Sequence, residues 1–211
     1  MILSDKEIRD MVKNYKNYEL ERPFIEPFNE ERLQGASYDV SMENIIHIYK
    51  NEFKTIDLKN QNQIDSIYDE VIIDNGYEIG PKEYILVTLN EVINLPNNII
   101  AHVRPRTKFT RLGLILSDQH CNQTYCGKLQ LGIFNATNCA MRIYPDLKIG
   151  QLVFEELKSI PSENKWYKNH KDSVYNNEEN FIGSKVSYEI KQKADLEYKN
   201  ILKKLLESED K

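Results

Sequence analysis

The sequence predicts a mainly β protein of the barrel or jelly-roll kind, with one helix before the strands and another after them. Between Ala36 and Leu157, short runs of β-branched and aromatic residues alternate with turn residues, which is typical of antiparallel sheets. Amphipathic segments lie on either side of this region. The length of 211 residues suits one domain with an appendage better than two full domains.

The first predicted element is a helix that begins at Ser4. Ser4 and Glu7 have the spacing of a capping box, in which each side chain accepts a hydrogen bond from the other residue's backbone amide. Pro23 and Pro27 end any continuation of this helix, because proline lacks the amide hydrogen that a helix interior needs. The apolar residues that follow at helical spacing are Ile8, Met11 and Val12.

The strands follow as separate short runs. A polar stretch at 60–69 interrupts them, and we expect it to form a loop or a short helix over the surface. Predicted strands lie at 37–40, 45–49, 84–89, 99–103, 129–134 and 152–154.

The chain after the strands changes character twice. Residues 158–187 contain too few aliphatic side chains for a core of their own, so we expect them to lie over another part of the fold. A helical pattern follows, which divides the chain into a domain at 1–187 and a helical extension at 188–211. Docking of this helix on its own domain is favoured over a partner-binding or intersubunit role. Its apolar face comprises Ile190, Ala194, Ile201, Leu202, Leu205 and Leu206.

The charge balance argues against several classes of protein. Charged residues make up 29% of the chain and the net charge is −5, so we expect no nucleic-acid polymer as a partner. The N-terminus lacks the basic and apolar regions of a signal peptide, and no apolar run approaches the roughly 20 residues of a membrane span. We therefore expect a soluble, cytoplasmic protein without a membrane partner.

The cysteine count is odd, since only Cys121, Cys126 and Cys139 are present, and this disfavours a secreted disulfide framework. The pair Cys121 and Cys126 beside His120 admits a zinc interpretation, but the usual Cys-x2-Cys pairs are missing. Small buried or half-buried thiols are the favoured alternative. No metal site is predicted.

The most informative segment is basic and directly follows the apolar run at 99–103. Between Arg104 and Arg111, four cations and two hydroxyls lie within eight residues. A turn of this composition at the end of a buried strand can clamp a phosphate, because arginine presents a planar fork of donors and backbone amides add more. A solvated turn is the alternative interpretation, and composition alone does not separate the two.

Six segments, taken in order along the chain, share the pattern of one family. They are ILSDKEI at 2–8, GASYDV at 35–40, LVTLNEV at 86–92 with Leu95-Pro96, RTKFTRLG at 106–113, GKLQLGIFN at 127–135 and YPDLKIGQL at 144–152. Together they resemble the dCTP deaminase family over residues 1–187. The resemblance implies a dUTPase-like β fold, a homotrimer, and nucleotide sites built where subunits meet.

The family's Arg-Ser-Ser-x-x-Arg signature implies phosphate contacts and a role in holding the attacking water. Here Arg106 and Arg111 keep the two guanidinium groups. Thr107 keeps a hydroxyl, and Lys108 replaces the second serine with a cation. The resemblance therefore implies that all four side chains bind nucleotide phosphates. Any Mg²⁺ would come with those phosphates, and no cofactor held by the protein is expected.

The family's Asp-Pro-Gly-aromatic-x-Gly element implies contacts to the deoxyribose 3′-hydroxyl and the base. Counting back from Gly127 places Asn122 at the aspartate and Tyr125 at the aromatic position. Asn122 can accept a hydrogen bond from a sugar hydroxyl, but it cannot act as a base. A later family segment closes over the triphosphate, which implies Tyr167 and Lys171 as further contacts.

The family's catalytic glutamate, which activates water for attack on cytosine, corresponds to Gly132. Asn135 fixes the register of this strand. Because glycine carries no proton-accepting side chain, ordinary hydrolytic deamination lacks its general base. Gln130 lies two residues earlier on the same strand face, where it either binds the pyrimidine edge or is simply a polar residue on a half-exposed strand.

Two functions remain open at this point. The favoured one is a catalytically silent trimer that binds a nucleotide, most simply a pyrimidine deoxynucleoside triphosphate. The alternative is an active dCTP deaminase or dUTP diphosphatase that uses a relocated catalytic base. The candidates for that base are Asp118 and His120, although the loop that carries them is shorter than the family's pattern.

Overall fold

The structure is a computed structural model that describes residues 1–50, 52–186, 189–190, 196–197 and 199–201. The chain divides into two compact units. The larger comprises Met1–Tyr49 and Asp69–Phe181, and the smaller comprises Lys50–Tyr68 and Ile182–Lys211. The domain boundary expected at 187–188 falls on residues outside the described ones and stays a prediction.

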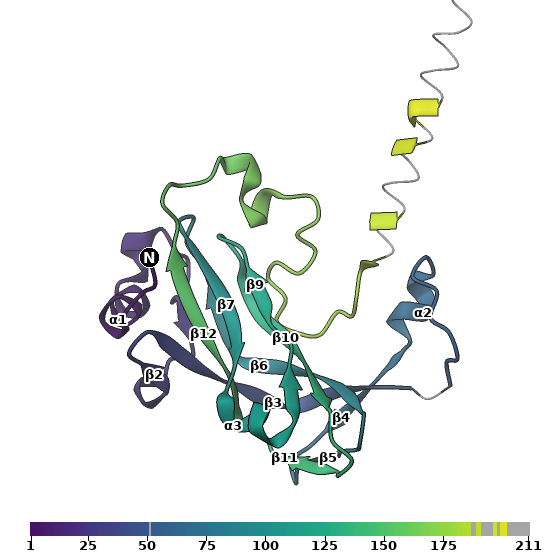
Figure 1. Cartoon of the computed structure of the whole chain (residues 1–211). Helices are drawn as coiled ribbons and strands as arrows, with labels where there is room; N and C mark the ends of the chain where they lie inside the picture. Colours follow the sequence, from purple (N-terminus) through teal and green to yellow (C-terminus); the bar gives the residue numbers. More distant parts are fainter. Residues whose placement is uncertain (51, 187–188, 191–195, 198, 202–211) are drawn as a thin grey trace, which may run out of the picture. The chain divides into compact units, whose positions relative to one another are not determined.

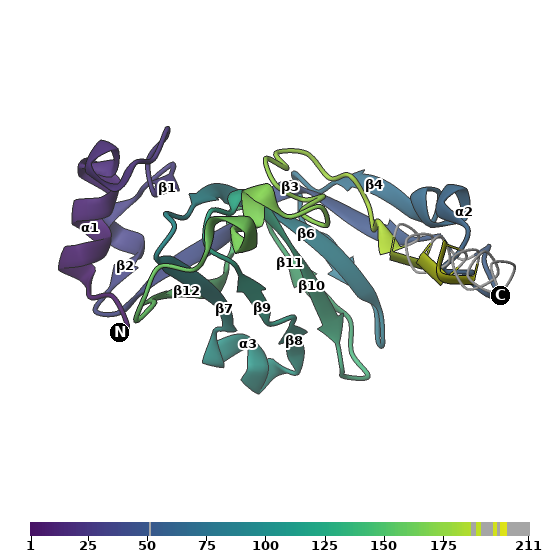
Figure 2. The same ribbon diagram turned by 90° about the horizontal axis from the view of Figure 1, so that it is seen from above.

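A curled antiparallel sheet forms the larger unit (Figures 1 and 2). Its strands run in the order β8-β10-β6-β3-β12-β7-β9, while β1 pairs with β6, and β2 and β4 pair with β3. β5 and β11 form a separate pair. The mainly β fold class is confirmed. The strands are β1 Ile25–Glu26, β2 Leu33–Gln34, β3 Ser37–Tyr49, β4 Tyr68–Ile72, β5 Tyr77–Ile79, β6 Tyr84–Asn94, β7 Ile99–Pro105, β8 Leu114–Leu116, β9 Gln119–Cys121, β10 Cys126–Asn135, β11 Met141–Ile143 and β12 Lys148–Glu156.

The core lies against one face of the sheet, because successive side chains of a strand point to opposite faces. Along β6, Ile85, Val87 and Leu89 are fully buried. The alternate residues Tyr84 and Leu86 face the other way and are less buried. Each buried aliphatic side chain contributes about 1.5–3 kcal/mol relative to an exposed one. The alternation therefore leaves an outer face on β3, β6 and β10 that the core does not use.

The N-terminal helix forms as predicted. α1 spans Asp5–Lys13, and Ser4 and Glu7 complete the capping box. Ile8 and Met11 are buried, with exposed fractions of 0% and 3%, so the predicted apolar face packs into the core. A 3-10 turn, η1, follows at Tyr15–Tyr18.

Most of the basic segment forms a helix, not the turn that its composition suggested. α3 spans Thr107–Leu112 and follows β7 directly. Gly113 ends it with a φ of 83°, a left-handed conformation that suits glycine. A Cβ at Gly113 would lie 2.4 Å from Cγ2 of Thr137, so the close approach of that loop also requires glycine.

The polar stretch that begins at 158 lies over the start of β10, as expected. Its short turns are η3 (Glu163–Lys165) and η4 (Tyr167–Asn169). The Asn177 amide donates to the Cys126 carbonyl at 2.6 Å, and the Lys128 amide donates to the Glu178 carbonyl at 2.7 Å. These bonds attach the segment to β10 by its backbone.

The smaller unit contains α2 at Gln61–Asp65, so of the loop or short helix expected at 60–69 the structure has the helix. Asn60 caps it, because its side-chain oxygen accepts a hydrogen bond from the Gln63 amide at 3.1 Å. The described residues at 188–211 are helical. Of the predicted apolar face of that helix, Ala194, Leu202, Leu205 and Leu206 lie outside the described residues. Within the described ranges, no helix has the length and apolar character that crossing a membrane requires.

Candidate functional site

The predicted phosphate cluster lies on and beside α3. The side chains of Thr107, Lys108 and Arg111 are exposed. Arg106, by contrast, is largely committed to the fold, since its Nη2 lies 3.2 Å from Oδ2 of Asp39 and its Nη1 donates to the Lys148 carbonyl. An open hollow of about 330 Å³ lies beside Arg106 and Lys108. These three exposed side chains can therefore reach an anion, while Arg106 has a structural role as well.

We expect Arg106→Ala to lower the free energy of unfolding by about 2 kcal/mol. The Asp39 side chain is only 5% exposed, so removal of Arg106 leaves a nearly buried carboxylate without its partner. Because Arg106 itself is 23% exposed, the loss of stability should be smaller than for a fully buried ion pair. Arg104→Ala is the matched control, because the exposed Arg104–Asp118 pair should contribute about 0–1 kcal/mol. Urea denaturation measures both, and equal losses would contradict the structural role of Arg106.

Tyr84 occupies the space above Gly132. A Cβ built on Gly132 would lie 2.0 Å from the Tyr84 Oη and 2.5 Å from its Cζ. The register explains this, because β10 pairs with β6 so that Gly132 faces Leu86 and Phe134 faces Tyr84. Burial raises the pKa of Tyr84, so its hydroxyl stays neutral. The place where the sequence comparison put a glutamate therefore holds a neutral phenol.

Gln130 lies on the same strand face, two residues before Gly132. Its Oε1 accepts a hydrogen bond from Oγ1 of Thr88 at 2.7 Å, and its backbone carbonyl accepts one from Nε2 of Gln119 at 2.5 Å. Its own Nε2 is buried and has no partner. The contacts to Thr88 and Gln119 fit a polar strand residue, whereas the unpartnered Nε2 leaves room for a ligand.

The predicted sugar and base contacts lie elsewhere on the chain. The Oδ1 of Asn122 is 3.1 Å from Nε2 of His120. Tyr125 is 5% exposed, donates its hydroxyl to the Lys128 carbonyl at 3.2 Å, and places its ring 5.7 Å from the ring of Tyr167. Burial raises the pKa of Tyr125. Lys171 is exposed in the segment beyond.

The candidates for a relocated base are already engaged. The Asp118 carboxylate pairs with Arg104 Nη1 at 3.0 Å. Its neighbours in sequence, Ser117 and Gln119, both donate hydrogen bonds to backbone carbonyls of β10. His120 bonds Asn122 and lies with its ring 4.9 Å from that of His102. The described part of one chain thus shows no hydrogen bond or ion pair that joins α3, Gln130 and Asn122 into one site.

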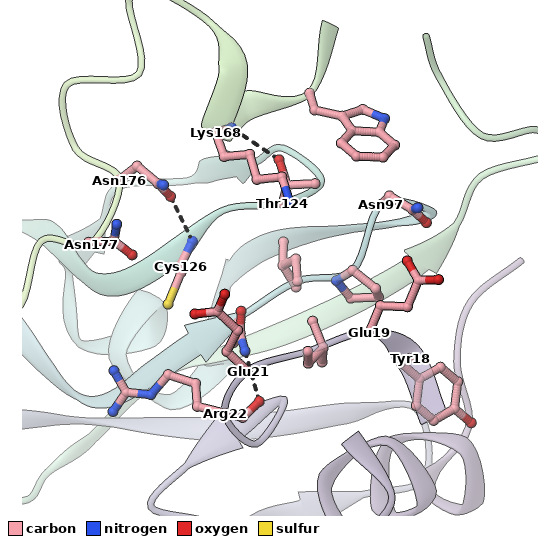
Figure 3. Close-up of a pocket in the computed structure, with 15 residues that line it drawn as sticks. Tyr18, Glu19, Glu21, Arg22, Asn97, Thr124, Cys126, Lys168, Asn176 and Asn177 are labelled. Atoms are coloured by element: carbon pink, nitrogen blue, oxygen red, sulfur yellow. Dashed lines mark hydrogen bonds between the residues drawn. The ribbon is translucent and has the colours of Figure 1, made fainter. Parts of the chain in front are cut away.

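A polar pocket of about 450 Å³ lies at the opposite end of the sheet from α3 (Figures 1 and 3). The Lys168 amide donates to Oγ1 of Thr124 at 3.1 Å, which holds the segment after β12 against the turn before β10. No predicted site residue lines this pocket. Glu19 and Glu21 line it together with Arg22 and Lys168, so its lining carries charges of both signs and does not form a cationic cluster.

The cysteines do not form a metal site. In the part of the chain that the structure describes, no three His, Cys, Asp or Glu side chains group as metal ligands. Cys121 is buried, Cys126 is half-buried and Cys139 is exposed, and all three are free. Burial raises the pKa of Cys121 to about 12, so it is an inert core thiol.

One buried histidine was not singled out by the sequence. The His47 side chain on β3 is 6% exposed, and its Nε2 lies 3.6 Å from Oε2 of Glu70. Its ring centroid lies 3.8 Å from that of Phe181, and its Nδ1 has no hydrogen-bond partner. Burial lowers the pKa of His47, which keeps the imidazole neutral at neutral pH. The alternation of the strand at 45–49 places His47 on the outer face, but only the register shows what lies across from it.

Comparisons with known proteins agree with this fold. A family model described as dCTP deaminase-like matches residues 2–157. The chain is 31% identical over 165 residues to "dCTP deaminase, dUMP-forming" of Persephonella marina, covering 78% of this chain and 88% of that protein. It is 35% identical over 164 residues to the protein of the same description from Hydrogenobaculum sp., covering 77% and 86%.

A solved structure is also similar. The 2′-deoxycytidine 5′-triphosphate deaminase from Agrobacterium tumefaciens superposes with a TM-score of 0.59 at 19% identity. The match covers 82% of this chain and 53% of that one, so this chain spans about half its length. At this level of identity, the similarity supports the fold alone.

Proposed function

The chain belongs to the dCTP deaminase-like family, and on that premise we propose that it binds a nucleotide without performing ordinary dCTP deamination. The ligand we propose is a pyrimidine deoxynucleoside triphosphate, bound in the cytoplasm where subunits of a homotrimer meet. Mg²⁺ would accompany the phosphates.

The observation that carries this proposal is the contact between Tyr84 and Gly132. Hydrolytic deamination needs a group that takes a proton from water, and such general bases contribute about 10²–10⁴-fold to the rate. Gly132 has no side chain, and the Tyr84 Oη lies 2.0 Å from where one would begin. Because the pKa of Tyr84 is raised, this phenol is a hydrogen-bonding group rather than a base.

The phosphate end of the site is supported by the exposed side chains of α3. Lys108 and Arg111 are exposed cations, and Thr107 adds a hydroxyl. Arginine and lysine form charge-assisted hydrogen bonds to phosphate oxygens, which are about twice as strong as neutral ones. A small local cluster is enough for this, although the whole chain is acidic.

A trimer is supported by two features of the single chain. First, the predicted contacts lie apart, on α3, on the outer face of β10 and in the turn before β10. Second, Leu112 on α3 and Ile115 on β8 are 59% and 53% exposed, and such apolar side chains gain stability when another subunit covers them. Assembly would bring separate contacts together at one ligand.

A hydrolase with a relocated base is the less supported alternative. Asp118 is paired with Arg104, and His120 is bonded to Asn122, so neither stands free to replace the glutamate. No observation specific to this structure favours hydrolysis over binding.

We expect Arg111→Ala to weaken nucleotide binding about tenfold or more and to leave the fold intact. A hydrogen bond to a charged group contributes about 1.5–3 kcal/mol, and 1.4 kcal/mol is a factor of ten. Isothermal titration calorimetry with dUTP, dCTP and dTTP measures the loss. Arg142→Ala is the matched control, because Arg142 is equally cationic and exposed but pairs with Glu78 on β5. Equal nucleotide affinities for both variants would show that α3 does not contribute to the binding site.

A further inference from the structure

The outer face of the sheet carries a row of residues that spans three strands. His47 on β3 pairs with Leu86 on β6, and Leu86 pairs with Gly132 on β10. Residues directly opposite each other on neighbouring strands point to the same face. Strands lie about 4.8 Å apart, so His47 and Gly132 stand on one face roughly 10 Å from each other, with the half-buried Leu86 between them.

His47 brings an unused acceptor to this row. Glu70 lies on the Nε2 side of the ring at 3.6 Å, which favours the tautomer that carries its proton on Nε2. The other nitrogen, Nδ1, is then a hydrogen-bond acceptor, and it is buried without a partner. Buried polar atoms in folded proteins are nearly always paired, so an unpaired acceptor is a place where a ligand can supply the donor.

Gln130 brings an unused donor to the same face. Oγ1 of Thr88 donates to its Oε1, which orients the amide and leaves Nε2 buried and unpaired. In the described part of the chain, three buried side-chain polar atoms lack a hydrogen-bond partner: His47 Nδ1, Gln130 Nε2 and Arg32 Nε. Arg32 is already paired with Glu91 through its Nη1. His47 and Gln130 share the outer face of the sheet with Gly132.

We propose that His47 and Gln130 read the edge of the nucleotide base, with His47 Nδ1 accepting from a base N–H and Gln130 Nε2 donating to a base acceptor. The base would lie over Leu86, next to the Tyr84 ring that occupies the space above Gly132. Pyrimidine bases carry a donor next to an acceptor on one edge, which suits this pair of groups. The Phe181 ring covers His47, so it has to move away when the base binds. In its new position the ring can stack on the base. This inference rests on the proposed function.

The test separates the base from the phosphates. Calorimetric titration compares dUTP, dCTP and dTTP with inorganic triphosphate, which lacks a base but reaches the same cations. We expect His47→Leu to weaken binding of the preferred nucleotide about three- to tenfold, the range for one lost neutral hydrogen bond, and to leave triphosphate binding unchanged. His47→Gln, which can restore an acceptor, should recover part of the loss. His170→Leu, at an exposed histidine, is the matched control.

Gln130→Met is the second variant and should show the same selective loss, so the test does not depend on how well the His47 variants fold. Unchanged nucleotide affinity in both variants would overturn the inference, and so would an equal loss for nucleotide and triphosphate. If the wild-type protein binds triphosphate but no nucleotide, the proposed function fails first, and this outcome is distinct from a failure of His47 alone.

Discussion

Arg32→Ala is expected to destabilise the fold by about 3–5 kcal/mol, the cost of leaving a buried charge without its partner. Glu91 has an exposed fraction of 0% and bonds Arg32 Nη1, the Ser41 amide and the Ser41 hydroxyl. Without Arg32, the carboxylate would keep only the serine contacts. Equilibrium unfolding in urea at neutral pH measures the loss.

Arg9→Ala is the control, because the Arg9–Glu30 pair lies at the surface, where solvent screens the attraction between the two charges. Burial already raises the pKa of Glu91 in the intact protein. A raised folded-state pKa favours the folded state at low pH and opposes it as pH rises through that pKa. The Arg32→Ala defect should therefore shrink as the pH is lowered. A loss no greater than that of Arg9→Ala would contradict the buried-pair account.

The second large effect concerns the missing carboxylate. We expect Gly132→Glu/Tyr84→Ala to deaminate dCTP at least about a hundredfold faster than the wild type, since a positioned general base contributes about 10²–10⁴-fold. Gly132→Glu alone should gain less, because its Cβ would lie 2.0 Å from the Tyr84 Oη and the phenol would first have to move. Tyr84 is 37% exposed, so its ring can turn to solvent without unfolding the sheet.

Gly132→Gln/Tyr84→Ala is the matched control, with the same shape and no base. Release of ammonia or formation of the uracil product is followed for all three variants and the wild type. A double variant that binds dCTP but stays inactive would show that the missing glutamate is not what separates this chain from deaminating relatives.

Local patterns predicted much of the fold. The capping box at Ser4 and Glu7 and the strand at 84–89 depend on neighbours in sequence, and both appear in the structure. The basic segment was predicted as a turn, but most of it forms the helix α3, which ends at Gly113, and composition does not reveal this helical turn.

The site was harder to predict because it depends on register. That Tyr84 fills the space above Gly132, and that His47 shares its row, follows from the pairing of β3, β6 and β10, which no short motif encodes. Likewise, the composition around Arg106 did not show that Asp39 engages it. Whether the predicted nucleotide contacts meet in one site stays a prediction about the assembled protein.

The central claim is that the protein binds a nucleotide without deaminating it. The direct measurement incubates the purified protein with dCTP and dUTP in the presence of Mg²⁺ and follows product formation and melting temperature together. The account predicts stabilisation without turnover, with about 2.7 kcal/mol gained at a hundred times the dissociation constant. Deamination of dCTP at the turnover rate of an ordinary enzyme, or no melting shift with any nucleotide, would contradict it.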